Sequence, residues 1–292
     1  QAAQPVASAS GMAAASAGVS TPAPGVAPTA GTTGPAPAPA VTGQKIAVKT
    51  DIFNLTFDTT GGSLVGAELL KYQERGHSGQ PFKLIDVSPK LQYMAQTGLI
   101  GGQYPNHLTP MTLTSAEREL PSGKDELQVR FESAQTGGLK LVKTYTLKRG
   151  SYAIGVRLEV INTSAAPLSA QLYNQLVRDS SEGPDSHQFY SSYTGPAFYS
   201  NEGKYQKTKF SNIDKNSATF QKETQSGYVA MVQHYFATAW LPESGLAREN
   251  YVRQQNGLYA AGQIFNLGEI QPGGTSVSNT TLFAGPQQED VK

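Results

Sequence analysis

The chain has 292 residues, and its 23 Lys and Arg nearly balance its 22 Asp and Glu, for a formal net charge of +1. A chain with so balanced a charge lacks the excess of basic residues that nucleic-acid binding requires, and we expect no nucleic-acid partner. The sequence has no cysteine, which excludes disulfides, thiolate metal sites and cysteine nucleophiles. It also has no run of about 18 apolar residues, the length that predicts a membrane-spanning helix.

Residues 1–44 differ sharply in composition from the rest of the chain. They contain no charged, histidine or aromatic residue and consist mainly of Ala, Pro, Gly, Ser and Thr. Such a segment cannot bury enough apolar surface to offset the entropy lost on ordering it. We therefore expect a disordered Ala/Pro-rich linker over residues 1–44 and a folded domain over residues 45–292. Because residue 1 is Gln, we also expect the chain to be a processed or excised piece of a longer protein.

Apolar and polar residues alternate along much of residues 45–292, which predicts strands because successive side chains of a strand point to opposite faces. In chain order, strands are predicted at 53–57, 127–131, 139–147, 151–161 and 168–176, separated by turn-forming residues. Helix is predicted only for residues 115–120 and for the acidic end that begins near Pro286. Many short strands without helices between them predict an all-β fold of stacked antiparallel sheets.

The segment 227–242, GYVAMVQHYFATAWLP, holds the only tryptophan of the chain and a high density of apolar residues. This much apolar surface is expected to be buried. A helix can be drawn through its apolar positions, but Gly227 and Pro242 bracket it tightly and the surrounding chain is strand-like. We predict two buried strands, at 228–232 and 236–241, that meet at a corner near residues 233–235.

A search for catalytic arrangements finds no metalloprotease, serine-hydrolase, phosphate-binding or dinucleotide motif. The best candidate is the loop 178–187, whose acidic and histidine side chains could hold a cation or act as acid and base: Asp179, Glu182, Asp185 and His187. A solvated polar loop is the simpler interpretation. His234 could face a cleft as a general acid, although a buried histidine bonded to a main-chain carbonyl is the commoner arrangement.

A different signal lies in residues 189–210, where aromatic residues are interleaved with lysines. This combination is typical of recognition surfaces, because aromatic rings supply apolar contact area and lysines supply charge. Alternatively, half of the aromatic residues belong to the core and the lysines protect an edge strand. We predict that partner binding involves the following residues: Tyr190, Tyr193, Phe198, Tyr199, Lys204, Tyr205, Lys207 and Lys209.

Several short motifs occur in an order that resembles the large first periplasmic domain of YidC-type membrane protein insertases from Gram-negative bacteria. The segment 227–242 is the most specific match, and the set spans essentially all of residues 45–292. The other matches are IAVKTD (46–51), DTTGG (58–62), LKRGSYA (147–153), KYQKTKF (204–210), QPGG (271–274) and LFAGP (282–286).

The resemblance implies a β-supersandwich similar to the galactose mutarotase fold, at the periplasmic face of the bacterial inner membrane, between two transmembrane helices of the intact protein. It implies that membrane protein insertion resides in a transmembrane bundle outside this chain. For the domain itself it implies a non-enzymatic role without cofactor or metal, with SecD and SecF, the Sec translocon and nascent membrane proteins as partners.

Two alternatives from other functional classes remain open at the level of sequence. A mutarotase-like enzyme or lectin would bind a sugar or polymer and would need a histidine and a carboxylate to converge, with His187 or His234 and Asp179, Asp185 or Glu243 as the candidates. A secreted adhesin-like β-sandwich would account for the strands without any membrane-spanning segment in its parent protein.

Overall fold

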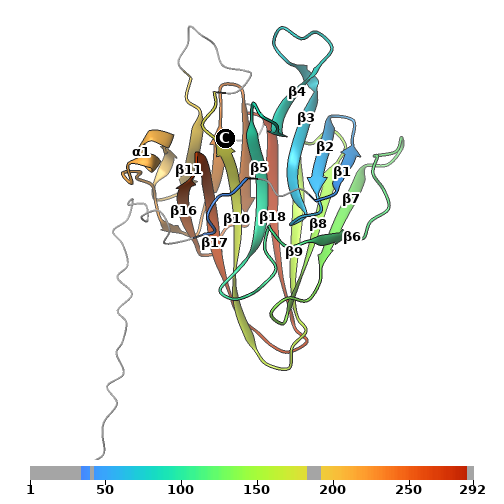
Figure 1. Cartoon of the computed structure of the whole chain (residues 1–292), viewed down its shortest axis with the longest axis vertical. Helices are drawn as coiled ribbons and strands as arrows, with labels where there is room; N and C mark the ends of the chain where they lie inside the picture. The colour runs from blue at the N-terminus through green and yellow to red at the C-terminus, as the bar shows by residue number, and fades with distance from the viewer. Residues whose placement is uncertain (1–33, 40–42, 183–191, 288–292) are drawn as a thin grey trace, which may run out of the picture.

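The computed structural model describes residues 34–39, 43–182 and 192–287, and these form a sandwich of two nine-stranded sheets. Every ladder within both sheets is antiparallel, as the alternating pattern predicts, so the all-β expectation is confirmed. The described residues contain one helix, α1 (Phe210–Asp214), which is far too short to cross a bilayer. Figure 1 shows the two sheets stacked with their strands running lengthwise through the molecule.

The first sheet, sheet A, contains in spatial order β1 (Lys45–Lys49), β2 (Phe53–Asp58), β3 (Ser63–Gln73), β4 (Pro81–Val87), β5 (Gln92–Ile100), β10 (Leu168–Asp179), β17 (Leu258–Ile270), β16 (Arg248–Gln255) and β13 (Glu223–Thr224). The second, sheet B, contains β12 (Lys204–Lys207), β11 (Gly195–Ser200), β14 (Tyr228–Val232), β15 (Phe236–Pro242), β18 (Thr275–Pro286), β9 (Ala153–Asn162), β8 (Leu139–Lys148), β7 (Glu126–Ser133) and β6 (Met111–Leu113).

All the strands predicted from alternation are present, as β2, β7, β8, β9 and β10. The helix predicted at 115–120 is wrong, because this segment is extended and runs beside β1. The Leu120 amide donates to the Lys49 carbonyl, and the Lys49 amide donates to the Arg118 carbonyl, both at 2.9 Å. Six residues form too few intrahelical hydrogen bonds to compete with the open edge of a sheet. At the other predicted helix, Pro286 ends β18 and residues 288–292 lie outside the described part.

The strands predicted at 228–232 and 236–241 are β14 and β15. The predicted corner near residues 233–235 is a tight turn, and the two strands pair with each other as a hairpin in which Val229 lies opposite Trp240. The Gln233 amide donates to the Phe236 carbonyl at 3.0 Å and closes the turn. Gly227 enters the hairpin with φ of 85°, and a Cβ there would lie 1.6 Å from the Tyr199 carbonyl oxygen. Only glycine allows the two chain segments to approach this closely.

The interior of the sandwich combines apolar packing with hydrogen bonds between the sheets. Trp240 is fully buried, and its Nε1 crosses from sheet B to donate to the main-chain carbonyl of Gln175 in sheet A at 2.9 Å. The Tyr145 hydroxyl, on the inner face of β8, likewise donates to the carbonyl of Gly62 in the β2–β3 turn. Such bonds fix the position of one sheet relative to the other, which apolar contacts alone do not, because hydrogen bonds are directional.

Lys143 lies on the same inner face of β8, where it interrupts an otherwise apolar row. Its side chain is fully buried, and its Nζ donates to the carbonyls of Gly61 at 2.6 Å and Thr97 at 2.7 Å. Burial lowers the pKa of Lys143 from 10.5 to about 7. An ammonium removed from water is stabilised here only by carbonyl dipoles, so the folded state favours loss of its proton near neutral pH.

We expect the free energy of unfolding to rise as the pH increases from 7 to 9. The pKa of Lys143 in the folded state, about 7, lies below its unfolded value of 10.5, so the unfolded chain binds more protons in this window. Linkage then gives a slope of at most about 1.4 kcal/mol per pH unit. Urea titrations followed by the fluorescence of Trp240 measure this slope. Lys143→Met should remove most of it, and Lys83→Met, at an exposed position of β4, should retain it. Equal slopes in the wild type and Lys143→Met would contradict the assignment.

Candidate functional site

The predicted partner-binding stretch forms part of a hollow at the β12 edge of sheet B. The hollow, here called the aromatic hollow, has a volume of about 480 Å³. Strands β11, β12 and β14, the β14–β15 turn and the residues on either side of these strands build its walls. It is lined by Ser192, Tyr193, Tyr199, Tyr205, Lys207, Tyr228, Val232, Gln233, His234, Ala237 and Gln287.

Three tyrosines form a row across the outer face of the sheet. Tyr205 in β12 lies opposite Tyr199 in β11, and Tyr199 lies opposite Tyr228 in β14. Residues directly opposite each other on antiparallel strands share a face, so the register brings the rings together. The rings of Tyr199 and Tyr228 are stacked, with centroids 5.6 Å apart. Tyr205, at the outer end of the row, is 43% exposed and offers its ring to a partner.

The positive charge of the hollow comes from Lys207. Its Nζ lies over the ring of Tyr193, 5.2 Å from the centroid. The Tyr193 hydroxyl donates to the carbonyl of Pro196 and so fixes the ring beside the lysine. Opposite Lys207 on β11 is Ala197, and opposite that on β14 is Ala230, so in the row next to the tyrosines Lys207 is followed by two methyl side chains.

Tyr193, Tyr205 and Tyr228 remain neutral at physiological pH. Burial, together with the neighbouring phenols of Tyr205 and Tyr199, raises the pKa of Tyr228 to about 12. Burial raises the pKa of Tyr205 and of Tyr193 as well. The hollow therefore presents these three neutral phenol groups next to one lysine. It suits a ligand with apolar and hydrogen-bonding groups, and an acidic group could lie near Lys207.

The other residues predicted for partner binding lie elsewhere. Phe198 is fully buried and stacks on Phe220 with ring centroids 4.5 Å apart, so it belongs to the core. Lys204 is the first residue of β12 and has φ of 57°, and Lys209 directly precedes α1; both are exposed. Tyr190 lies outside the described residues. Because β12 is an edge strand of sheet B, its terminal lysines Lys204 and Lys207 also stand where charge discourages pairing with another chain.

Some residues of the hollow come from the segment 227–242, which its sequence identifies only as core. Tyr228 faces outward because it has the opposite orientation to Val229 along β14. His234, considered above as a cleft-facing acid, is half-buried at the hollow, and its ring centroid is 4.0 Å from that of Tyr235. The alternation of side chains along 228–232 could have predicted this position of Tyr228. If Val229 points into the core, the adjacent Tyr228 must point outward.

The loop with the best catalytic constellation holds a structural carboxylate. Asp179 accepts hydrogen bonds from the Gln92 amide at 2.8 Å and from the Ser181 hydroxyl at 2.6 Å, which ties the end of β10 to the start of β5. Asp185 and His187 lie outside the described residues. Within the part of the chain that the structure describes, no three His, Asp or Glu side chains are grouped to hold a metal ion.

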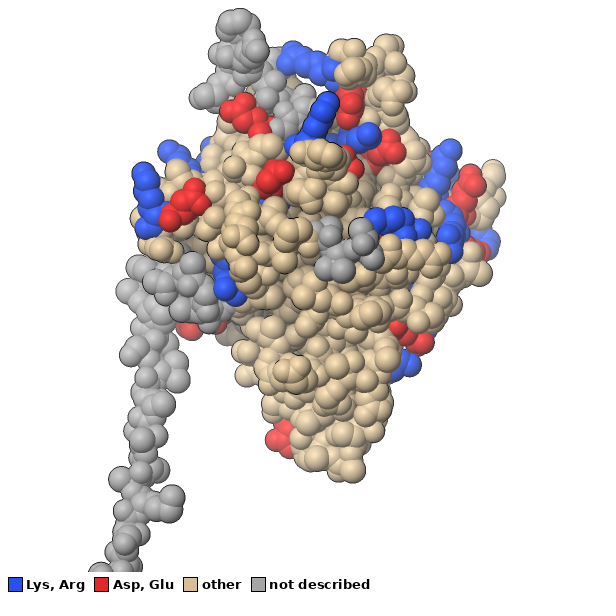
Figure 2. Space-filling model, viewed as in Figure 1, with Lys and Arg blue, Asp and Glu red and all other residues tan. Residues whose placement is uncertain are grey.

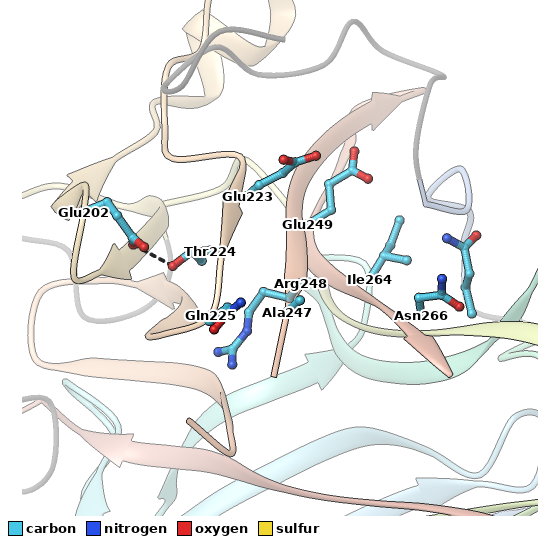
Figure 3. Close-up of a pocket in the computed structure, with 10 residues that line it drawn as sticks. Glu202, Glu223, Thr224, Gln225, Ala247, Arg248, Glu249, Ile264 and Asn266 are labelled. Carbon is cyan, nitrogen blue, oxygen red and sulfur yellow. Dashed lines mark hydrogen bonds between the residues drawn. The ribbon is translucent and has the colours of Figure 1, made fainter. Parts of the chain in front are cut away.

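A second hollow, of about 510 Å³, lies beside β13, β16 and β17 and is lined mainly by polar side chains (Figure 3). Glu202 accepts a hydrogen bond from the Thr224 hydroxyl at 2.7 Å, which lowers the pKa of that carboxyl. Figure 3 shows the carboxylates of Glu223 and Glu249 pointing away from the guanidinium of Arg248.

Arg248, the cation of this second hollow, is bonded to the main chain. It donates to the Gly227 and Glu243 carbonyls at 2.9 Å and to the Leu246 carbonyl at 2.8 Å. Its guanidinium also lies over the Phe265 ring, 5.5 Å from the centroid. Because these contacts occupy the guanidinium, the role of Arg248 is to join the β15–β16 connection to its neighbours. The residues that line this hollow include no acid and base placed to exchange a proton with a substrate.

The two stacked nine-stranded sheets define a β-supersandwich of the galactose mutarotase type. A galactose mutarotase related enzyme from Lactobacillus acidophilus superposes on the chain with a TM-score of 0.54 at 7% identity, over 85% of this chain and 100% of that one. A galactose mutarotase-like protein from Clostridium acetobutylicum gives a TM-score of 0.52 at 8% identity, over 82% of this chain and 94% of that one. At such identities the likeness shows the fold alone.

Sequence comparison identifies the family. The chain belongs to the YidC periplasmic domain family, whose model matches residues 45–291. The membrane protein insertase YidC of Bordetella petrii is 48% identical over 251 residues, which cover 84% of this chain and 44% of that protein. The YidC of Cupriavidus necator is 44% identical over 270 residues, covering 92% and 48%. The chain thus spans a little under half the length of these relatives, and the resemblance inferred from the ordered motifs is confirmed.

We predict that adjacent residues of β11 differ strongly in their effect on stability. Phe198→Ala should lower the free energy of unfolding by about 3–5 kcal/mol, because it opens a cavity in the core. Tyr199→Ala removes only a half-buried ring from the outer face and should cost about 1 kcal/mol. Urea unfolding followed by Trp240 fluorescence checks both values. A loss for Tyr199→Ala as large as that for Phe198→Ala would show that the hollow is part of the core.

Proposed function

We propose that this chain is a non-enzymatic docking domain of a membrane protein insertase, located at the periplasmic face of the bacterial inner membrane. In this proposal the domain assists insertion and folding of inner-membrane proteins by contacting accessory Sec components such as SecD and SecF, the Sec translocon or nascent membrane proteins. The observation that carries the proposal is the aromatic hollow with Lys207 at its side. Family membership supports the setting, because the relatives are named membrane protein insertases.

The chemistry of the aromatic hollow favours a polypeptide ligand. Tyrosine rings give large contact areas at a small entropic cost, and their hydroxyls accept or donate hydrogen bonds with a peptide backbone. A volume of about 480 Å³ holds a few side chains of a partner but not a folded domain. The hollow would therefore receive an anchoring segment, while the exposed surface around Tyr205 and β12 provides the rest of the interface.

Charge on the visible surface is mixed, with neither sign forming a continuous patch on the face shown in Figure 2. The lower end of this face, where β9, β10, β17 and β18 turn, carries few charged groups. Long-range steering by a strong field is thus a poor explanation for partner selection on this face.

The lysines around the aromatic hollow provide the test. Replacing Lys204, Lys207 and Lys209 together by Glu should change the melting temperature little, because all three are exposed. Crosslinking to Sec components or nascent chains, from a photoreactive residue placed at Tyr205 in the full-length insertase, should fall about fivefold or more, since the change removes the cation over the Tyr193 ring and places negative charges beside the hollow.

A matched variant controls for the change in net charge. Lys71, Lys83 and Lys90 are exposed lysines of β3, β4 and the β4–β5 connection, and their joint replacement by Glu should leave the crosslinks unchanged. Undiminished crosslinking in the Lys204, Lys207 and Lys209 variant would refute docking at this edge. A large drop in its melting temperature would instead show that these lysines serve the fold.

A further inference from the structure

Six residues of the Ala/Pro-rich region lie against the outer face of sheet A. These residues, 34–39 with the sequence GPAPAP, are here called the strap. Figure 1 shows the dark-blue strap passing in front of β10 and β17. Pro37 is buried, and only Pro39 is fully exposed to solvent. The strap therefore has a defined seat on the domain, several residues before β1 begins.

The first contact of the strap is made by Gly34 and the ring of Tyr251 on β16. A Cβ on Gly34 would lie 2.3 Å from Cε2 and 2.5 Å from Cζ of that ring. Gly34 also has φ of 67°, which a residue with a side chain rarely adopts. Both observations require glycine here, because the main chain itself lies on the aromatic ring.

The second contact is a hydrogen bond from Arg253, two residues further along β16. Its Nη1 donates to the Gly34 carbonyl at 2.6 Å. Arg253 Nε is buried and has no hydrogen-bond partner among the residues that the structure describes. A guanidinium with a buried donor still unused is suited to a ligand rich in carbonyl acceptors, and an extended main chain is such a ligand.

The surface of sheet A beneath the strap is held in place by buried polar side chains. Tyr251 is fully buried, and its hydroxyl donates to Gln175 Oε1 at 2.7 Å. Gln175 Nε2 in turn donates to Gln96 Oε1 at 2.9 Å. Gly262 on β17 leaves room for the Tyr251 hydroxyl, since a Cβ there would lie 2.5 Å from it. The ring that supports the strap is thus positioned before the strap binds.

These contacts follow the general physics of proline-rich recognition. Proline fixes φ, so a chain with proline at alternate positions loses little conformational entropy when it binds. Its tertiary amides donate no hydrogen bonds, and its carbonyls remain free to accept them. An aromatic ring paired with a side-chain donor is the arrangement that such segments bind.

We propose that the outer face of β16, around Tyr251 and Arg253, is a binding site for an extended alanine/proline segment, and that residues 34–39 of the chain itself are its occupant. The site pins the linker to the domain ahead of the first strand. It lies on sheet A and involves none of the residues of the aromatic hollow on sheet B, so it stands independently of the docking function.

Binding in trans tests the site with the full 292-residue chain. In one variant the strap is replaced by Gly-Ser-Gly-Ser-Gly-Ser, and the probe is a fluorescein-labelled peptide with the sequence of residues 31–43. Fluorescence anisotropy should show saturable binding to this variant. The affinity of the peptide for the wild-type chain should be at least about tenfold weaker, because the chain's own strap competes at high effective concentration. Adding Arg253→Ala to the strap-replaced chain should weaken binding about fivefold.

Two matched controls make the result specific. A labelled peptide with valine at the position of Gly34 should not bind, because its Cβ collides with Tyr251. In the full chain, Gly34→Val should displace the strap and free the site for the unmodified peptide. Pro39→Val, at the exposed position, should leave the strap in the site, so that the peptide is still excluded. Near-UV circular dichroism establishes that each variant is folded; if Arg253→Ala is not, Arg253→Gln takes its place.

Three results would overturn the proposal. The first is no saturable binding to the strap-replaced chain. The second is equal affinity for the glycine and valine peptides, which would mean that no defined seat exists. The third is a Gly34→Val chain that excludes the peptide as the wild type does, which would show that the strap does not occupy the site.

Discussion

Hydrogen bonds that run from buried side chains of sheet B to main-chain carbonyls of sheet A are the interactions on which the rest of the structure depends. Trp240 reaches the carbonyl of Gln175, and Lys143 and Tyr145 reach carbonyls in the β2–β3 turn. Apolar contacts hold the sheets together but allow them to slide, because the hydrophobic effect has no direction. Fixed donors and acceptors select one relative position, and a donor without its acceptor in a dry interior would be costly.

This inter-sheet register also positions the aromatic hollow. Trp240 anchors β15 from the inside, and β15 pairs with β14, whose outward Tyr228 stacks on Tyr199 of β11. Gly227 allows the close approach of the two segments at this point. The outer face of the sheet edge is thus as well defined as the core behind it, which is what a preformed recognition site requires.

Gln175 links the interior to the opposite surface of sheet A. Its main-chain carbonyl accepts the hydrogen bond from Trp240, and its side-chain oxygen accepts the hydrogen bond from Tyr251, the residue under the strap. A central strand that is buried on both faces can serve both sides in this way, because its backbone and its side chain are engaged independently. The pattern of β10 reflects this, since residues 170 and 172–178 are all buried.

The sequence by itself determined the strands, because alternating apolar residues can be buried only on one face of a sheet, and it determined the family through the order of short motifs. Local pattern failed where a distant partner decided the outcome: residues 115–120 became extended beside β1, and Phe198, which was predicted to bind a partner, was buried against Phe220. Lys143 would be expected to be an exposed lysine, but the fold brings to its Nζ the carbonyls of Gly61 in the β2–β3 turn and Thr97 in β5. Only the tertiary structure could place these groups and the strap, because each depends on contacts between residues far apart in the chain, which no local preference encodes.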